Sequence, residues 1–108
     1  KTPRDIEYDV IARITGRLQA HLPHERGRTS PGLVSALNDN RRLWTAFATD
    51  LASADNAFPH DLKARLFFLA EFTLRHTGLV LRGTAPADAL AEINTSVMRG
   101  LRGQRVAS

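Results

Sequence analysis

Four stretches of the sequence place apolar residues at every third or fourth position, and this spacing constrains the fold more than any other feature. The first stretch repeats them every four residues, at Ile6, Val10, Ile14 and Leu18. An α-helix brings residues at this spacing onto one face, whereas a half-buried strand needs them at every second position. The chain has no alternating stretch long enough for such a strand, and it lacks the Asn-Gly and Asp-Gly pairs of tight hairpins. The pattern therefore predicts an all-α fold.

Capping residues and prolines give the predicted boundaries of these helices. Ser30-Pro31 pairs a capping residue with a proline, which suits the first helical position because proline has no backbone N–H to leave unpaired. Proline also stands near the start of each of the other three stretches. Gly100 and Gly103 bracket the end of the last helix, so we expect a short frayed C-terminal tail. The prediction is a small single-domain bundle over residues 1–108, with four helices at about residues 3–22, 31–52, 60–82 and 87–100.

The absence of cysteine favours the cytoplasm. Small secreted domains often depend on disulfides, and this chain of 108 residues has no cysteine with which to form them. No apolar run approaches the roughly 20 residues that span a bilayer, and the first seven residues contain no apolar signal-peptide region. We therefore expect a cytoplasmic protein without membrane insertion.

Residues that could support catalysis or metal binding have simpler explanations. The carboxylates Asp5, Asp61 and Asp88 stand at predicted helix starts, where they interact favourably with the helix N-terminus. His21 and His24 lie near Glu25, but Pro23 separates them and a convincing third metal ligand is missing. The chain also lacks a glycine-rich phosphate loop and a nucleophile elbow. We expect no enzymatic activity, no metal and no cofactor, and we expect the protein to work by binding another protein.

The net charge of +4 is compatible with nucleic-acid binding but does not favour it. The 15 basic residues are spread along the chain among 11 acidic ones. A dispersed charge of this size is typical of a solvated surface, and no nucleic-acid-binding motif accompanies it. RNA is therefore a less favoured partner than protein.

Asn40 and Trp44 are candidate binding residues in the second predicted helix. Asn40 is the one polar residue on an otherwise apolar face. It either bonds neighbouring backbone in the core and fixes helix register, or bonds the backbone of a partner. Trp44 and Phe47 either pack in the core or contribute to an interface, where tryptophan is enriched among the residues that dominate binding energy. The sequence leaves both alternatives open.

The third predicted helix carries more apolar residues than one face requires. Its aromatic side chains spread beyond the periodic stripe, at Phe67, Phe68 and Phe72. A helix that is apolar on more than one side lies at the centre of a protein or leaves one side for a partner. These phenylalanines are therefore further candidates for partner binding.

The segment Asn-Arg-Arg-Leu-Trp-Thr-Ala-Phe-Ala-Thr-Asp-Leu, residues 40–51, resembles the FlaF family of flagellar proteins from alphaproteobacteria. Three further parts are similar to this family in the same order: Thr2-Pro3-Arg4 with Glu7, residues 62–77, and Glu92-Ile93-Asn94 followed by residues 100–103. The resemblance thus covers nearly the whole chain. The loop at residues 52–59 departs from it, since it is longer and more polar than expected for the family.

The resemblance implies a cytoplasmic flagellar assembly factor that binds flagellin. The terminal segments of flagellin are amphipathic, and a small bundle with a spare apolar groove could hold one of them as a helix. This implies a secretion chaperone. The alternative is a regulator of flagellin synthesis that acts with FlbT or on flagellin messenger RNA. The predicted binding residues are Asn40, Arg41, Arg42, Trp44, Phe47, Phe67, Phe68 and Phe72.

Overall fold

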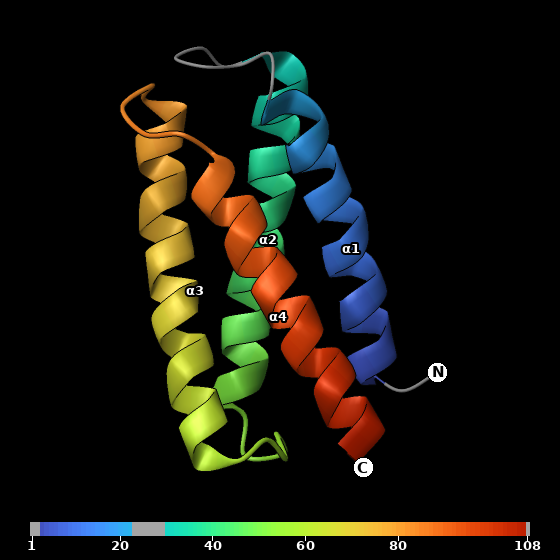
Figure 1. Ribbon diagram of the computed structural model, residues 1–108. Helices are drawn as coiled ribbons and strands as arrows, with labels where there is room; N and C mark the ends of the chain where they lie inside the picture. Colours follow the sequence, from blue (N-terminus) through green and yellow to red (C-terminus); the bar gives the residue numbers. More distant parts are fainter. Residues whose placement is uncertain (1–2, 23–29, 108) are drawn as a thin grey trace.

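The computed structural model describes residues 3–22 and 30–107, and these residues form four helices and no strand. The helices are α1 (Pro3–His21), α2 (Pro31–Ala52), α3 (His60–Leu81) and α4 (Asp88–Ala107) (Figure 1). The predicted all-α four-helix bundle is confirmed. The bounds of α1, α2 and α3 differ from the predicted ranges by at most one residue.

The last helix is longer than predicted. It continues through Gly100 and Gly103 to Ala107, where the sequence predicted an end at residue 100 and a frayed tail. A glycine inside a helix costs only about 1 kcal/mol relative to alanine. Leu101 is buried, and its packing in the core offsets that cost. Glycine therefore weakens α4 locally without ending it.

The helix ends follow the local chemistry of the sequence. The Ser30 hydroxyl accepts a hydrogen bond from the backbone N–H of Leu33 at 3.1 Å, as expected for the cap of α2. At the end of α3, Gly83 adopts a φ of 80° and its N–H donates to the carbonyl of Val80 at 3.0 Å. This left-handed conformation suits glycine because it has no Cβ. These contacts fix where α2 begins and α3 ends.

The polar loop after α2 is ordered by one asparagine. Asn56 donates from its side-chain amide to Asp50 at 3.0 Å and accepts from the backbone N–H of Phe58 at 3.0 Å. Phe58 is buried and packs on the core at this end of the bundle. The polar loop, which departs from the expected family pattern, thus positions the Phe58 side chain against the core.

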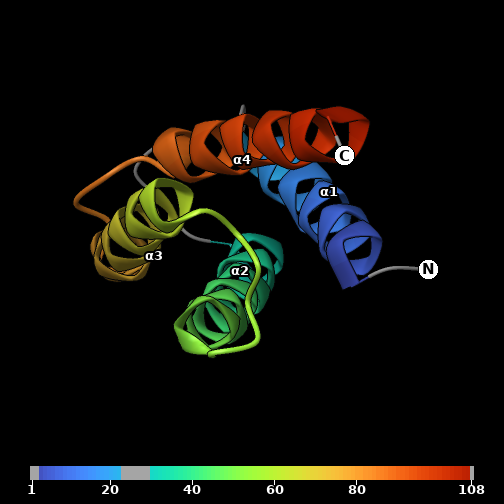
Figure 2. The ribbon, with the colours of Figure 1, turned by 90° about the horizontal axis from the view of Figure 1, so that it is seen from below.

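The helices pack unequally on one another. α1 packs against both α2 and α4, and α2 packs against α3, whereas α3 and α4 make few contacts. Figure 1 shows α3 and α4 close together near their connection at residues 82–87 and diverging towards the other end of the bundle. Figure 2 shows the same arrangement from below, with α4 lying over α1 and α3 standing beside α2. Of these neighbouring pairs, α3 and α4 are therefore the most loosely packed.

Two apolar clusters form the core, and a layer of buried polar residues separates them. Along α2 the polar residue Asn40 lies between Leu37 of one cluster and Trp44 of the other. The same order recurs on α3 and α4. The buried polar residues are Thr15, Asn40, Thr73, Thr77 and Asn94. Within the described parts of the chain, no helix has the length and apolarity required to cross a membrane.

Candidate partner-binding groove and its buried polar network

A chain of hydrogen bonds joins α2 to α4 through the buried polar layer. The indole Nε1–H of Trp44 donates to Oδ1 of Asn94 at 2.9 Å. The amide Nδ2 of Asn94 then donates to Oδ1 of Asn40 at 2.8 Å. All three side chains are fully buried. This chain, named here the Trp44–Asn94–Asn40 network, brings together two of the segments on which the family resemblance rests.

The polar layer is incompletely paired. The hydroxyls of Thr15 and Thr77 donate within their own helices, to the carbonyls of Ile11 and Thr73, both at 2.6 Å. Within the part of the chain that is described, Nδ2 of Asn40 and Oγ1 of Thr73 are buried without a hydrogen-bond partner. A buried polar group left unpaired costs about 1–3 kcal/mol. The hydrogen bonds between side chains of this layer therefore orient α2 relative to α4, while its unpaired groups lower the stability of the fold.

Trp44 and Phe47 are core residues in the free protein. Trp44 is fully buried and Phe47 almost so, with their ring centroids 5.5 Å apart. Asn40 is also buried, as the core interpretation proposed, but it bonds the side chain of Asn94 rather than backbone. None of the three side chains is available on the surface, and their part in partner binding stays a prediction.

Arg41 and Arg42 lie on α2, and Arg42 is placed beside an acidic residue of its own helix. Arg41 is half-buried, whereas Arg42 is exposed and lies 3.4 Å from Asp39. Asp39 also accepts a hydrogen bond from Arg17 of α1 at 2.5 Å, and this bond is the main cause that lowers the pKa of the Asp39 carboxyl. The group ties α1 to α2 at the surface. A binding role for the two arginines stays a prediction.

The three phenylalanines of α3 differ in exposure. Phe68 is 67% exposed, Phe67 is 38% exposed and Phe72 is half-buried. The Phe72 ring stacks on His76 with centroids 5.1 Å apart, and Nε2 of His76 lies 2.9 Å from the carbonyl of Pro86. Phe68 and Phe72 are one helical turn apart and share one side of α3. Phe67 points away from that side.

A groove lies between α3 and α4 where the two helices diverge. It has a volume of about 310 Å³. Its α3 wall consists of Leu69 and Phe72, and its α4 wall consists of Ala89, Glu92, Ile93 and Ser96. Phe68 does not line the groove itself, but it lies one turn from Phe72 on the same side of α3. The groove thus combines apolar walls with a polar α4 rim, which is the chemistry of a site for an amphipathic helix.

Several residues of this groove were missed from the sequence. Leu69 and Ile93 fall on the apolar stripes of their helices, which made them core candidates, yet both are only partly buried. A stripe shows which face is apolar and does not show whether a neighbouring helix covers it. The surplus aromatic residues of α3 were the sequence signal that pointed to this helix, and Phe72 among them lines the groove.

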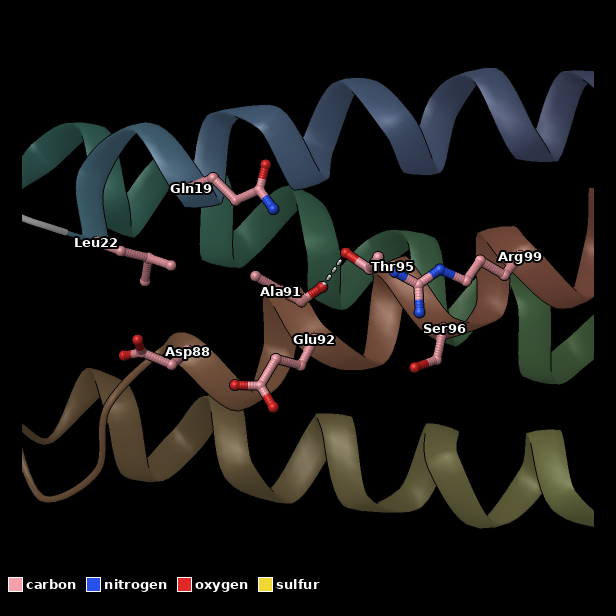
Figure 3. Close-up of a pocket in the computed structure, with 8 residues that line it drawn as sticks. All are labelled: Gln19, Leu22, Asp88, Ala91, Glu92, Thr95, Ser96 and Arg99. Carbon is pink, nitrogen blue, oxygen red and sulfur yellow. Dashed lines mark hydrogen bonds between the residues drawn. The ribbon is translucent and has the colours of Figure 1, made fainter.

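A second hollow lies between α1 and α4 and has a different character. Its volume is about 370 Å³. Figure 3 shows α1 contributing Gln19 and Leu22, while α4 contributes charged and hydroxyl side chains such as Glu92 and Arg99. The dashed line in this view is the hydrogen bond from the Thr95 hydroxyl to the carbonyl of Ala91, at 2.9 Å. These polar groups do not converge on a common point.

The described residues form no metal-binding cluster. Among them, no three His, Asp or Glu side chains are grouped so that they could hold a metal ion. His21 packs against Gly32, where an added Cβ would lie 2.5 Å from the imidazole ring. His24 and Glu25, the other residues of the partial metal pattern, lie outside the described residues.

Comparison with known proteins identifies the family. No curated protein and no solved structure gave a match to the chain. Residues 1–101 match the family described as flagellar protein FlaF. The match spans most of the sequence, including the segments that meet in the Trp44–Asn94–Asn40 network. The chain therefore belongs to the FlaF family of flagellar proteins, as the resemblance predicted.

Proposed function

We propose that this protein is a cytoplasmic secretion chaperone for flagellin, which holds an amphipathic terminal segment of flagellin as a helix in the α3–α4 groove. The observation that carries the proposal is the divergence of α3 and α4 beside an exposed aromatic side chain, Phe68. Membership in a flagellar protein family supports the choice of flagellin as the partner.

The energetics require more than one residue of the groove. Full burial of a phenylalanine side chain contributes about 1.5–3 kcal/mol, whereas ordering a disordered segment costs about 2–5 kcal/mol or more. Phe68 alone is therefore insufficient. Leu69, Phe72 and Ile93 are each partly exposed and can bury further surface against the same segment. A helix seated between α3 and α4 would contact all four side chains.

The direct test is a calorimetric titration of the protein with purified flagellin and with flagellin that lacks either terminal segment. We expect one-to-one binding with a negative heat-capacity change, because apolar surface is buried. We also expect this binding to disappear when one terminal segment is removed. Failure to bind any of the flagellin forms would reject the chaperone function, and FlbT and flagellin messenger RNA would then be the ligands to titrate.

A matched pair of variants locates the site on the groove. Phe68→Ala should weaken flagellin binding at least about tenfold, as expected for an aromatic residue central to an interface. Phe67→Ala removes the adjacent ring, which points away from the groove, and should have a smaller effect. Equal losses from the two variants would place the site on the outer surface of α3 instead. Both side chains are partly exposed, so both variants should fold.

A further inference from the structure

Two neighbouring residues of α4 point to different parts of the bundle. Asn94 points into the core and bonds two side chains of α2, whereas Ile93 lines the α3–α4 groove. Successive side chains project about 100° apart around a helix axis. If α4 rotates about its own axis, Asn94 therefore changes direction and a different set of α4 side chains faces the groove.

Apolar contacts alone would not keep the groove open. The other buried residues of α4, such as Leu90, Val97 and Leu101, make contacts that have no preferred direction. Leu69 and Phe72 on α3 and Ile93 on α4 remain partly exposed. A roll of α4 towards α3 that is small enough to leave Leu90 and Val97 in the core would bury these side chains against each other, and removal of apolar surface from water favours that movement.

The hydrogen bonds of Asn94 oppose this movement. Rolling α4 would separate Asn94 from both Trp44 and Asn40, and the polar groups would be left unpaired in a fully buried layer. Unpaired buried groups carry a desolvation cost, and hydrogen bonds, unlike apolar contacts, depend on direction. Buried asparagine pairs are known to fix helix register in this way.

We propose that the Trp44–Asn94–Asn40 network is a positioning device that sets the rotation of α4 and so keeps the α3–α4 groove open. Its three residues do not touch the occupant of the groove. They act through Ile93 and the other groove residues of α4. The purpose of the open groove rests on the proposed function, whereas the positioning role can be measured in the free protein.

The test uses the absence of cysteine from the chain. Cysteines introduced at the exposed positions Ala64 on α3 and Arg99 on α4 can carry spin labels, and electron–electron resonance then measures the distance across the opening. The network is removed by combining Asn40→Leu with Asn94→Leu, because leucine has the same number and connectivity of side-chain heavy atoms as asparagine. We expect the main distance peak to shift to shorter values in this double variant.

Thr15→Val is the matched control. Thr15 is also a buried polar residue, but its hydroxyl bonds only its own helix, so the control removes a buried polar group without releasing α4. The distance distribution should be the same as in the labelled parent. A folded double variant whose distances also match the parent would overturn the positioning role. If the double variant fails to fold, Asn40→Leu alone removes one bond of the network. It should then shift the distances in the same direction, and an unshifted distribution would overturn the proposal.

A flagellin titration of the same variants tests the functional consequence. The double variant should bind flagellin at least about tenfold more weakly than Thr15→Val, since its groove is partly closed. Shortened distances with unchanged flagellin affinity would show that the network does not serve the groove. If the unmodified protein binds no flagellin, the proposed function fails, and the distance measurement still decides the positioning role.

Discussion

Trp44 combines the packing of a large core side chain with a hydrogen bond that links two helices. It is fully buried, and its indole N–H is bonded to Asn94. Trp44→Ala should therefore lower the free energy of unfolding by about 3–5 kcal/mol, as is typical when a large buried side chain leaves a cavity. Urea denaturation followed by circular dichroism measures this change.

Phe68→Ala is the control for that measurement, because Phe68 is 67% exposed. Its unfolding free energy should stay within about 0.5 kcal/mol of the parent, as for most surface substitutions. Similar stability losses from Trp44→Ala and Phe68→Ala would contradict the assignment of one residue to the core and the other to the surface.

Asp39 makes the stability of the protein depend on acidity. The hydrogen bond from Arg17 lowers the pKa of the Asp39 carboxyl in the folded state, helped by the charges of Arg17, Arg42 and Arg13. A lowered pKa stabilises the fold above the ordinary pKa of the carboxyl, and this contribution is lost as the pH falls through the folded-state value. The stability advantage over Asp39→Asn should therefore be constant near neutral pH and should shrink below about pH 4.

Denaturation curves of the two proteins from neutral to acidic pH measure this difference. Because Asp39 and its arginine partners are substantially exposed, added salt should reduce the advantage. An advantage of Asp39 that grows as the pH falls would have the wrong sign for this ion pair.

At the level of single residues, the sequence showed which side chains are unusual for their position, but not where those side chains lie in the fold. Asn40 stood out as a polar residue on an apolar face, but its bonding partner Asn94 lies 54 positions further along the chain. Nothing in the helical period of either segment indicates that the two asparagines meet. Phe68 and Phe72 were likewise identified as surplus aromatics, whereas the partial exposure of Ile93 depends on how far α3 stands from α4.

At the level of helices, the effect of replacing glycine by alanine on stability has opposite signs at different positions. An added Cβ at Gly16 or Gly100 would meet no atom within 4 Å, so alanine fits inside both helices. Gly16→Ala and Gly100→Ala should each raise the free energy of unfolding by about 0.5–1 kcal/mol, because alanine loses less conformational entropy in a helix. Gly83→Ala should lower it by about 1–2 kcal/mol, because a φ of 80° places the new Cβ near a carbonyl oxygen.

Thermal unfolding of the three variants checks these signs in one series. Destabilisation by Gly16→Ala would mean that another helix approaches α1 closely at that point. An unchanged melting temperature for Gly83→Ala would mean that residues 82–84 relax to a right-handed conformation.

The helix boundaries were largely predictable because they depend on local chemistry. Ser30-Pro31 begins α2 through a side-chain cap and a fixed proline φ, and both act within one turn. The end of α4 was not predictable in this way. Gly100 favours a stop, but burial of Leu101 against residues from other helices favours continuation, and only the assembled core decides between them.

At the level of the whole molecule, the α3–α4 groove predicts the salt dependence of binding. Its walls are mainly apolar, so the affinity for a flagellin segment should change little between low and physiological salt. A protein that recognised messenger RNA through phosphate contacts would lose affinity steeply over the same range, because each contact releases counterions. Titrations at several salt concentrations distinguish the two. A steep loss with flagellin itself would mean that charged residues outside the groove dominate the interface.

The pairing of helices explains why this groove could not be located from the sequence. All four helices carry an apolar stripe, and each stripe looks capable of complete burial. α4 packs mainly on α1, the helix most distant from it in the sequence, and makes few contacts with its neighbour α3. Periodicity assigns a face to each helix but contains no information about which faces meet.

The bond between Trp44 and Asn94 also gives the protein an intrinsic optical reporter. Trp44 is the one tryptophan of the chain, and its indole N–H is bonded to a residue of α4, the helix that forms one wall of the groove. Indole fluorescence responds to the polarity and hydrogen bonding of this N–H. A ligand that shifts α4 would therefore alter the emission maximum without touching the tryptophan, and occupancy of the groove could be followed in real time in the unlabelled protein.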